Sequence, residues 1–421
     1  MALEQVFECP RTLAKLRSGP LGKLLEGFCH WLLSSGFSQW SIRTHLANLS
    51  HLNEYLGAAR VPPRERLSDR DVDGFLRAYP SWCRHRGSKE EHLHRIGYSV
   101  HRFTGYLREW GLFDSNTKVP IYQPILDAYL GWMRTHQHAS EGTLVRRAHS
   151  IRQFLQWLGA MTPLFNLAAL SADTVERFFV AYAKTMGRSA RRSMQSALRT
   201  FLRFCLHAGY LQQPLDRAVP TLRTYKLATV PRGLSNDQAQ QVLCGINRRC
   251  PVGRRDYAII QLLYTYGVRG GQLRALRMED IDWVQNRILF KAAKHGKDTR
   301  LPLTLEAGRS LLDYLRNSRP VCACSEVFVT SRAPHHPLTH SNALSAIVER
   351  HIRAAGIAIH SRGAHVFRHG FATRMLQQGY SLKAIADVLG HRHLTTTFIY
   401  TKVDFNALQQ VALDWPQEVS V

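Results

Sequence analysis

The fold is decided by a segment near the end of the chain, "HVFRHGFATRMLQQGYSLKAIADVLGHRHLTTTFIYTKVD", residues 365–404. It places His365, Arg368, His391 and Tyr400 among apolar residues of helical spacing. A buried core would not carry so many polar groups, and a solvent-exposed surface would not carry so many apolar ones. The mixture predicts a packed scaffold that presents these four side chains to a charged ligand.

Two helices are expected in this segment, over 364–378 and 381–389. His365 and Arg368 stand three residues apart on the first helix, so their side chains share one face. A glycine ends the second helix, and His391 follows it at once, where a helix end can aim the ring.

The segment alone leaves other interpretations open. Tyr400 could be a half-buried core residue, and His365 with Arg368 could belong to a structural ion-pair helix. Residues 381–400 could also form the helix-turn-helix of a DNA-binding regulator. The rest of the domain has to separate these interpretations.

An internal repeat organises the first half of the chain. Residues 31–57 and 132–159 share a Trp start, a Ser cap in the middle and an aromatic-Leu-Gly end. Each is followed by a similar helix, "LSDRDVDGFLRAY" and "LSADTVERFFVAY", and then by a basic helix. Two copies of one four-helix domain are therefore predicted, over 1–112 and 120–211; chance similarity between amphipathic helices is the alternative.

The basic helix that closes the second copy, around 188–208, contains no acidic residue. Arg188, Arg191, Arg192 and Arg199 recur on it at steps that favour one helix face. Such a stripe is typical of helices that bind phosphates, so these four are candidate DNA-binding residues. A solvated helix face is the simpler alternative.

Prolines mark the next boundary. Pro214, Pro220 and Pro231 fall within 212–234, and their density predicts an extended basic linker without helix. A third domain is expected over 235–421.

The third domain is predicted to be mostly helical with a small sheet. Ser235 and Gln238 have the spacing of a capping box at its first helix. Residues 286–304 have the pattern of a β-hairpin with a Lys/Gly/Asp turn. Further helices are expected over 254–267, 305–316 and 341–355.

Charge indicates the kind of partner. The 421 residues include 56 Lys and Arg against 31 Asp and Glu, a formal charge of +25, and 45% of the residues are hydrophobic. A folded basic protein of this kind is expected to bind a polyanion. No signal peptide is recognised, and no apolar run approaches the roughly 20 residues of a membrane-spanning helix, so no membrane partner is expected.

The eight cysteines are scattered and predict no disulfide framework, which favours a reducing cytoplasm. Cys322 and Cys324, with His335 and His336, could form a zinc site, although their spacing fits no standard pattern. Ordinary core thiols are the preferred interpretation, and no metal or other cofactor is expected.

Four ordered stretches of the third domain resemble the tyrosine recombinases, the phage-integrase-like and Xer-like family. "YTYGVRGGQLRALRMEDID" is similar to the first arginine box, and "AAKHGKDTRLPL" to the lysine hairpin. "HVFRHGFAT" is similar to the second box, and "LGHRHLTTTFIYTKVD" to the third box with its tyrosine. The resemblance is strong over 235–412 and looser over 120–211, where it implies a core-binding domain.

The resemblance assigns the expected catalytic residues. Paired arginines bind the scissile phosphate, histidines donate to it or accept a proton, a hairpin lysine protonates the leaving group, and a tyrosine attacks. In this sequence these residues are Arg269, Lys294, His365, Arg368, His391 and Tyr400.

Two details of the resemblance stay open. Gln272 stands where the family usually has an acidic residue. A residue at this position supports Arg269 and takes no part in the chemistry. Lys297 and Lys291 are the other candidates for the lysine role of Lys294.

The resemblance implies a mainly α fold: two amino-terminal four-helix (SAM-like) DNA-binding units and a mostly helical catalytic domain with a small sheet. It implies a site-specific recombinase that cuts and rejoins DNA through a 3′-phosphotyrosine, in the integration or excision of a mobile element. The implied partners are double-stranded DNA and three further copies of the chain, as a homo-tetramer on paired sites. A type IB topoisomerase and a non-catalytic helix-turn-helix regulator are the alternatives.

Overall fold

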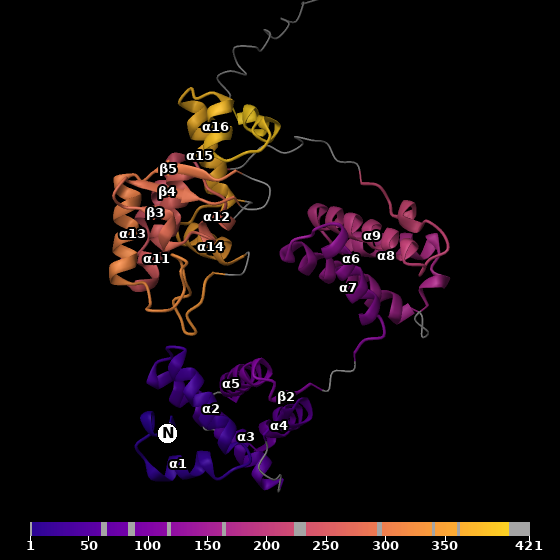
Figure 1. Ribbon diagram of the computed structural model, residues 1–421, viewed down its shortest axis with the longest axis vertical. Coiled ribbons are helices and arrows are strands. Elements are labelled where there is room, and N and C mark those ends of the chain that lie inside the picture. The colour runs from indigo at the N-terminus through magenta and orange to yellow at the C-terminus, as the bar shows by residue number, and fades with distance from the viewer. Residues whose placement is uncertain are drawn as a thin grey trace, which may run out of the picture. The chain divides into compact units, whose positions relative to one another are not determined.

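A computed structural model describes residues 2–59, 65–82, 89–115, 119–161, 166–222, 233–292, 297–338, 342–359 and 363–403. The fold is mainly helical with two small sheets, which confirms the predicted class (Figure 1). Met1–Asp114 with Leu227–Val421 form one compact unit, and Ser115–Lys226 form another. The finer domain boundaries stay predictions.

The first stretch of the chain packs helices around an apolar core that includes Phe28, Leu46 and Phe103. Ser38 caps the third helix by accepting a hydrogen bond from the Ser41 amide (3.3 Å). A short parallel strand pair was not expected. The elements are α1 (Pro10–Arg17), α2 (Gly22–Ser34), α3 (Gln39–Ala58), α4 (Asp69–Trp82), α5 (Lys89–Glu109), β1 (Leu67–Ser68) and β2 (Phe113–Asp114). Helix α1 is thus additional to the four helices that the repeat predicts.

The second stretch has its own core, with Tyr129, Phe154 and Phe201 fully buried. Ser171 caps its third helix by accepting from the Thr174 amide (3.2 Å). Its helices are α6 (Gln123–His136), α7 (Glu141–Met161), α8 (Ala172–Thr185) and α9 (Arg188–His207).

The prediction of a helix-free linker was wrong at its start. Residues Leu215–Ala218 form a 3₁₀ turn, and Leu215 and Val219 are buried in the core of the second stretch. Pro214 precedes the turn and Pro220 follows it, so the prolines bound a helical turn instead of preventing one. The apolar side chains between them supply the burial that holds this turn in place.

The carboxy-terminal part is built around a buried helix that packs against two others, α11 on α13 and α15 (Figure 1). Its helices are α10 (Asn236–Cys244), α11 (Pro251–Tyr266), α12 (Gly270–Arg274), α13 (Leu305–Asn317), α14 (Ala343–Ala354), α15 (His365–Gln377) and α16 (Leu382–Val388). The capping box of Ser235 and Gln238 is confirmed at the start of α10.

The predicted hairpin belongs to a three-stranded antiparallel sheet of order β3 (Ile281–Asp282), β4 (Arg287–Phe290), β5 (Thr299–Pro302). Ile288, a buried residue of β4, lies directly opposite Leu301 of β5. The strand β3 was not expected because two residues carry no periodic pattern. In the described part of the chain, no helix has the length and apolar character to cross a membrane.

Candidate active site

The turn between α11 and α12 positions Arg269. Gly267 ends α11 with a φ of 58°, and a Cβ at this position would lie 2.6 Å from the ring of Phe371. Only glycine allows this close approach. Arg269 follows as the N-cap of α12, and its amide donates to Gln272 Oε1 (3.1 Å). Gln272 therefore supports the backbone of Arg269 without supplying the negative charge of an acidic residue.

Arg368 approaches the same place from α15. It is 4% exposed, and its guanidinium donates to the carbonyls of Gly267 (2.9 Å) and Leu389 (2.8 Å). Arg269 Nη1 donates to the carbonyl of Gly390 (3.3 Å), so both guanidinium groups meet at the turn after α16. Within the described residues, neither forms an ion pair with a carboxylate. Two adjacent positive charges without a counter-ion make a site for an anion.

Both arginines remain charged despite their burial. Desolvation, with the nearby charge of Arg269, lowers the pKa of Arg368 to about 10, and Tyr400 opposes this shift. Desolvation also lowers the pKa of Arg269. A pKa near 10 still leaves the guanidinium of Arg368 protonated at neutral pH. An incoming phosphate would relieve the repulsion between the two groups.

His391 is aimed by the turn and held from behind. Gly390 has a φ of 62°, and a Cβ there would lie 2.9 Å from Thr299 Oγ1 at the start of β5. A hydrogen bond of 2.7 Å joins His391 Nδ1 to the hydroxyl of Thr397, which is fully buried. This contact fixes the ring and leaves Nε2 for the site.

The two predicted histidines are neutral in this arrangement. Burial, followed by the charges of Arg368 and Arg269, lowers the pKa of His391 to about 4. The same causes lower the pKa of His365. Neutral imidazoles beside two arginines can accept a proton or donate one N–H to an anion.

Tyr400 is buried, with 2% of its surface exposed, and packs with Ala372, Ile385 and Leu389. Burial raises the pKa of its phenol, and the charges of Arg368 and Arg269 oppose this rise. The hydroxyl is therefore protonated at neutral pH and needs an acceptor before it can attack a phosphate.

The side chain in polar contact with the Tyr400 hydroxyl is His369, which the sequence interpretation missed. His369 Nδ1 lies 3.1 Å from the Tyr400 hydroxyl, and the two ring centroids are 5.7 Å apart. Burial, followed by the neighbouring His365 and Arg368, lowers the pKa of His369. The spacing of His365 and His369, one turn apart on α15, was the available indication.

Of the three candidate lysines, the structure describes Lys291 and Lys297. Lys294 lies outside the described residues. Lys297 is exposed, and its carbonyl would lie 3.3 Å from a Cβ at Gly390. Lys291 is bound to Asp280 (2.8 Å) and its pKa is raised mainly by that hydrogen bond, so it is a poor proton donor.

The structure divides the four candidate arginines of α9. Arg188 and Arg192 are exposed. Arg191 Nε donates to the Met186 carbonyl (2.6 Å), and Arg199 donates to the Val219 carbonyl (2.8 Å). Through these bonds, Arg191 and Arg199 hold the segments before and after α9 against the helix.

A groove between α7 and α9 collects further basic residues. Arg192 lines it together with Arg146 and Arg147 of α7, which the sequence interpretation missed. They escaped notice because their helix was interpreted as part of a repeat and not for its charge. The remaining lining residues are small and polar, namely Thr143, Ser150, Ser189, Ser193 and Ser196.

Two alternatives of the sequence interpretation find no support. The residues that the structure describes contain no group of three or more His, Cys, Asp or Glu side chains that could hold a metal ion. In the segment that begins at residue 381, the short helix α16 is followed by two 3₁₀ turns, Leu394–Thr396 and Phe398–Val403. A helix-turn-helix requires a second helix, the recognition helix, at this place.

Fold and site together define a helical protein with a buried tyrosine beside a two-arginine anion site. The family model described as the phage integrase family matches residues 232–407. A Sinorhizobium fredii protein that carries the name integrase/recombinase y4rA is 31% identical, over 96% of this chain and 97% of its own length. The tyrosine recombinase XerC of Pelobacter propionicus is 29% identical over 69% of this chain and 95% of its own.

Solved structures agree on the fold. The XerH site-specific recombinase, in a post-cleavage complex with a palindromic difH substrate, matches with a TM-score of 0.53 and 20% identity, over 82% of this chain and 95% of that one. The chain belongs to the phage integrase family and is a site-specific recombinase of the tyrosine type. The topoisomerase and regulator alternatives are not favoured.

Proposed function

We propose that Tyr400 is the nucleophile that cuts DNA in this recombinase. The observation that carries the proposal is the placement of its hydroxyl beside two arginines that lack a carboxylate partner among the described residues. In the proposed step the Tyr400 oxygen attacks the scissile phosphorus and the bond to the 5′-oxygen breaks. The phosphate stays on the tyrosine as a 3′-phosphotyrosine, and the leaving 5′-oxygen takes up a proton.

The surrounding residues have separate roles in this proposal. Arg269 and Arg368 hold the non-bridging oxygens, because planar guanidinium groups donate two parallel hydrogen bonds and keep their charge. His365 and His391 donate to the same oxygens or receive the proton of the nucleophile. Lys294 protonates the 5′-oxygen. Rejoining reverses these steps with the 5′-hydroxyl of another strand, and the phosphotyrosine conserves the energy of the broken bond.

The DNA on which this chemistry acts is proposed to lie along the groove between α7 and α9. Arg146, Arg147 and Arg192 supply positive charge there, and the hydroxyls beside them can donate to phosphates. Arg188, Arg191 and Arg199 extend the basic surface of α9.

The test is covalent trapping on a nicked suicide substrate, followed by denaturing electrophoresis. The wild-type chain should form a covalent complex, and Tyr400→Phe should bind DNA with unchanged affinity but form none. A covalent complex formed by the Tyr400→Phe variant would contradict the assignment of Tyr400 as the nucleophile. Lys294→Ala should regain cleavage on a substrate with a 5′-thio leaving group; rescue of Lys297→Ala instead would transfer the role to Lys297.

The finer biological role is also part of the proposal. We place the protein in the cytoplasm as a homo-tetramer on paired sites, acting in the integration or excision of a mobile element. Residues 404–421 lie outside the described residues, but their apolar spacing predicts an amphipathic helix that packs on a neighbouring copy. Deleting them should preserve binding to one site and abolish four-copy assembly on two sites in analytical ultracentrifugation. Retained assembly would contradict this.

A further inference from the structure

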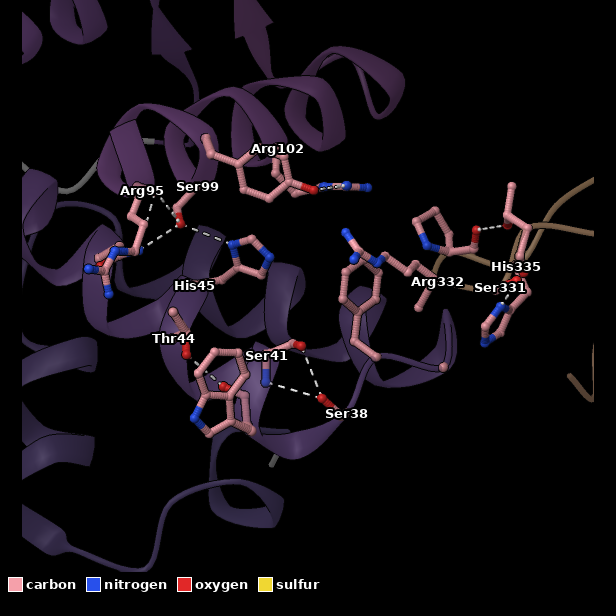
Figure 2. A pocket seen from close by; sticks show the side chains of 18 of the residues that line it. Ser38, Ser41, Thr44, His45, Arg95, Ser99, Arg102, Ser331, Arg332 and His335 are labelled. Carbon is pink, nitrogen blue, oxygen red and sulfur yellow. Dashed lines mark hydrogen bonds between the residues drawn. The ribbon is translucent and has the colours of Figure 1, made fainter. Parts of the chain in front are cut away.

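Helices α3 and α5 of the first stretch form two walls of a groove, and residues 330–336 of the carboxy-terminal part line its remaining side (Figure 2). The α3 and α5 walls correspond to the groove between α7 and α9. Figure 2 shows these walls, with Ser41, Thr44 and His45 on one side and Arg95, Ser99 and Arg102 on the other. The sequence repeat did not disclose this correspondence, because the lining residues differ in identity. It becomes visible when the lining positions of the two grooves are compared in register.

The helix registers are set by residues outside the grooves. Aligning the Gly57 and Gly159 ends of the repeat superimposes the Ser38 and Ser140 starts of α3 and α7. Aligning the buried Val100 with the buried Met194 fixes α5 against α9. Neither alignment uses a lining residue.

In these registers each lining position of the second groove has a counterpart that lines the first. On α3 and α7 the pairs are Ser41 with Thr143, Thr44 with Arg146, His45 with Arg147, and Asn48 with Ser150. On α5 and α9 they are Arg95 with Ser189, Tyr98 with Arg192, Ser99 with Ser193, and Arg102 with Ser196. All of these positions are polar or amphipathic. A structural helix pair would close such a seam with apolar side chains.

The two grooves also share a device that holds the helices apart at a fixed distance. In the first, His45 Nδ1 and Ser99 Oγ are hydrogen-bonded (3.0 Å), and Asn48 donates to the same hydroxyl (2.9 Å), as Figure 2 shows for His45. In the second, Arg147, at the position of His45, donates to Ser196 Oγ (2.8 Å). In both grooves, hydrogen bonds between the two helices therefore fix the spacing of the walls.

The chemistry of the first groove suits an anionic partner. None of its described lining residues is Asp or Glu, and Arg95 and Arg102 lie on one wall. Arg95 forms an exposed ion pair with Glu91 (3.7 Å), and such a surface pair contributes little to stability. Arg102 lies against the rings of Phe37 and Tyr98, which hold its guanidinium towards the groove.

We infer that the groove between α3 and α5 is a second DNA-binding face, which holds the backbone of a duplex segment separate from the one held between α7 and α9. This inference rests on the proposed function of the α7–α9 groove. The hydroxyl of Ser41, which accepts from Ser38 within the structure, donates to a phosphate, and the two arginines supply charge.

A photo-cross-linking experiment on the full-length chain tests the location. Trp40 lines the groove and is 76% exposed, so p-benzoylphenylalanine in its place should cross-link to a labelled random-sequence duplex several helical turns long. The matched control carries the same photoprobe in place of Trp110, which is 63% exposed and does not line the groove. Cross-links to DNA from position 40 and not from 110 support the inference. A protein–protein cross-link from position 40 would overturn it in favour of a second copy of the chain.

Salt dependence of binding to the same duplex gives an independent measurement. Arg95→Gln with Arg102→Gln should flatten the log–log salt slope by up to about two units, since each phosphate contact contributes about 0.9. Arg70→Gln with Arg77→Gln removes equal charge from exposed positions of α4 and should leave the slope nearly unchanged. Equal slopes for both double variants would reject the inference.

Failure of the proposed function would look different. Arg146→Gln with Arg192→Gln tests the α7–α9 groove, and covalent trapping tests Tyr400. If these assays succeed while position 40 gives no DNA cross-link, only the second face is wrong. If Arg146→Gln with Arg192→Gln leaves DNA affinity unchanged, the α7–α9 groove does not bind DNA. The inference by correspondence with that groove is then contradicted, whichever cross-links position 40 gives.

Discussion

The hydroxyl of Tyr400 is held by a hydrogen bond with His369 Nδ1 (3.1 Å). Because burial favours the protonated phenol, the side chain needs a neutral base at hydrogen-bond distance, and the lowered pKa of His369 keeps that imidazole neutral. His369 is therefore a positioning residue, which orients the hydroxyl of the nucleophile before DNA arrives.

His369→Ala should slow covalent complex formation about tenfold, the value of one lost hydrogen bond of roughly 1.4 kcal/mol, with DNA affinity unchanged. His369→Asn should restore most of the rate, because its side-chain amide reaches the position of Nδ1. Single-turnover cleavage of a suicide substrate measures both. A wild-type rate for the Ala variant would show that the contact has no role in the reaction.

At the scale of single residues, the sequence predicted which side chains gather but not their contacts. The structure brings Arg269, Arg368, His365, His391 and Tyr400 to one turn, while their catalytic roles stay predictions. His369 was missed because helical periodicity gives a face and not a partner. Thr397, which holds His391, was missed because it lies in a 3₁₀ region without any period.

At the scale of elements, the turn after α16 connects the arginines, the histidine and the hairpin. Gly390→Ala would place a Cβ 2.9 Å from Thr299 Oγ1 in a left-handed conformation that disfavours side chains by roughly 1–2 kcal/mol. The turn should shift and carry His391 away from the arginines. Cleavage should fall at least tenfold, while DNA affinity changes less than twofold.

Gly379→Ala is the matched control for that variant. Gly379 has a φ of 82°, so the backbone strain is similar, but its added Cβ would meet no atom within 4 Å. If both variants lose cleavage equally, backbone strain and not the contact with the hairpin explains the loss.

Helix α11 carries a buried carboxylate, Asp256, that supports the core below the site. Arg255 and His351 hydrogen-bond to it, and Arg350 reaches it as well. Burial alone would raise the pKa of Asp256, but these partners outweigh it and the pKa is lowered.

Asp256→Asn should therefore destabilise the protein by about 3–5 kcal/mol, because it leaves the buried Arg255 charge uncompensated. Asp313→Asn breaks a more exposed pair with Arg254 and should cost less than about 1 kcal/mol. Urea unfolding at pH 7 compares the two, and equal losses would contradict the assigned role of Asp256.

Element boundaries followed from sequence where local chemistry sets them. The capping box of Ser235 and the glycine after α16 each act within a few residues. The 3₁₀ turn after Pro214 could not be predicted in this way, since it depends on burial of Leu215 and Val219 against distant helices. The strand β3 likewise exists only through its pairing with β4.

At the scale of the whole molecule, two buried histidines in different cores make the protein sensitive to acid. Burial lowers the pKa of His45, and burial with the two active-site arginines lowers that of His391, in each case to about 4. The unfolded chain binds protons at these positions with a pKa near 6.5. The unfolded state therefore gains protons first, and stability present above pH 6.5 is lost as the pH falls towards 4.

The slope of this loss is about 1.4 kcal/mol per pH unit for each histidine. His45→Asn, whose amide can keep the bond to Ser99, should lessen the fall of the thermal unfolding midpoint between pH 7 and pH 5. His101→Asn, which removes an exposed histidine from α5, should retain the wild-type fall. Differential scanning fluorimetry across this range compares the three proteins. If the His45 variant loses as much stability in acid as the His101 variant, the acid sensitivity arises elsewhere, and the buried imidazole in the wall of the α3–α5 groove is not a site where protons act on the fold.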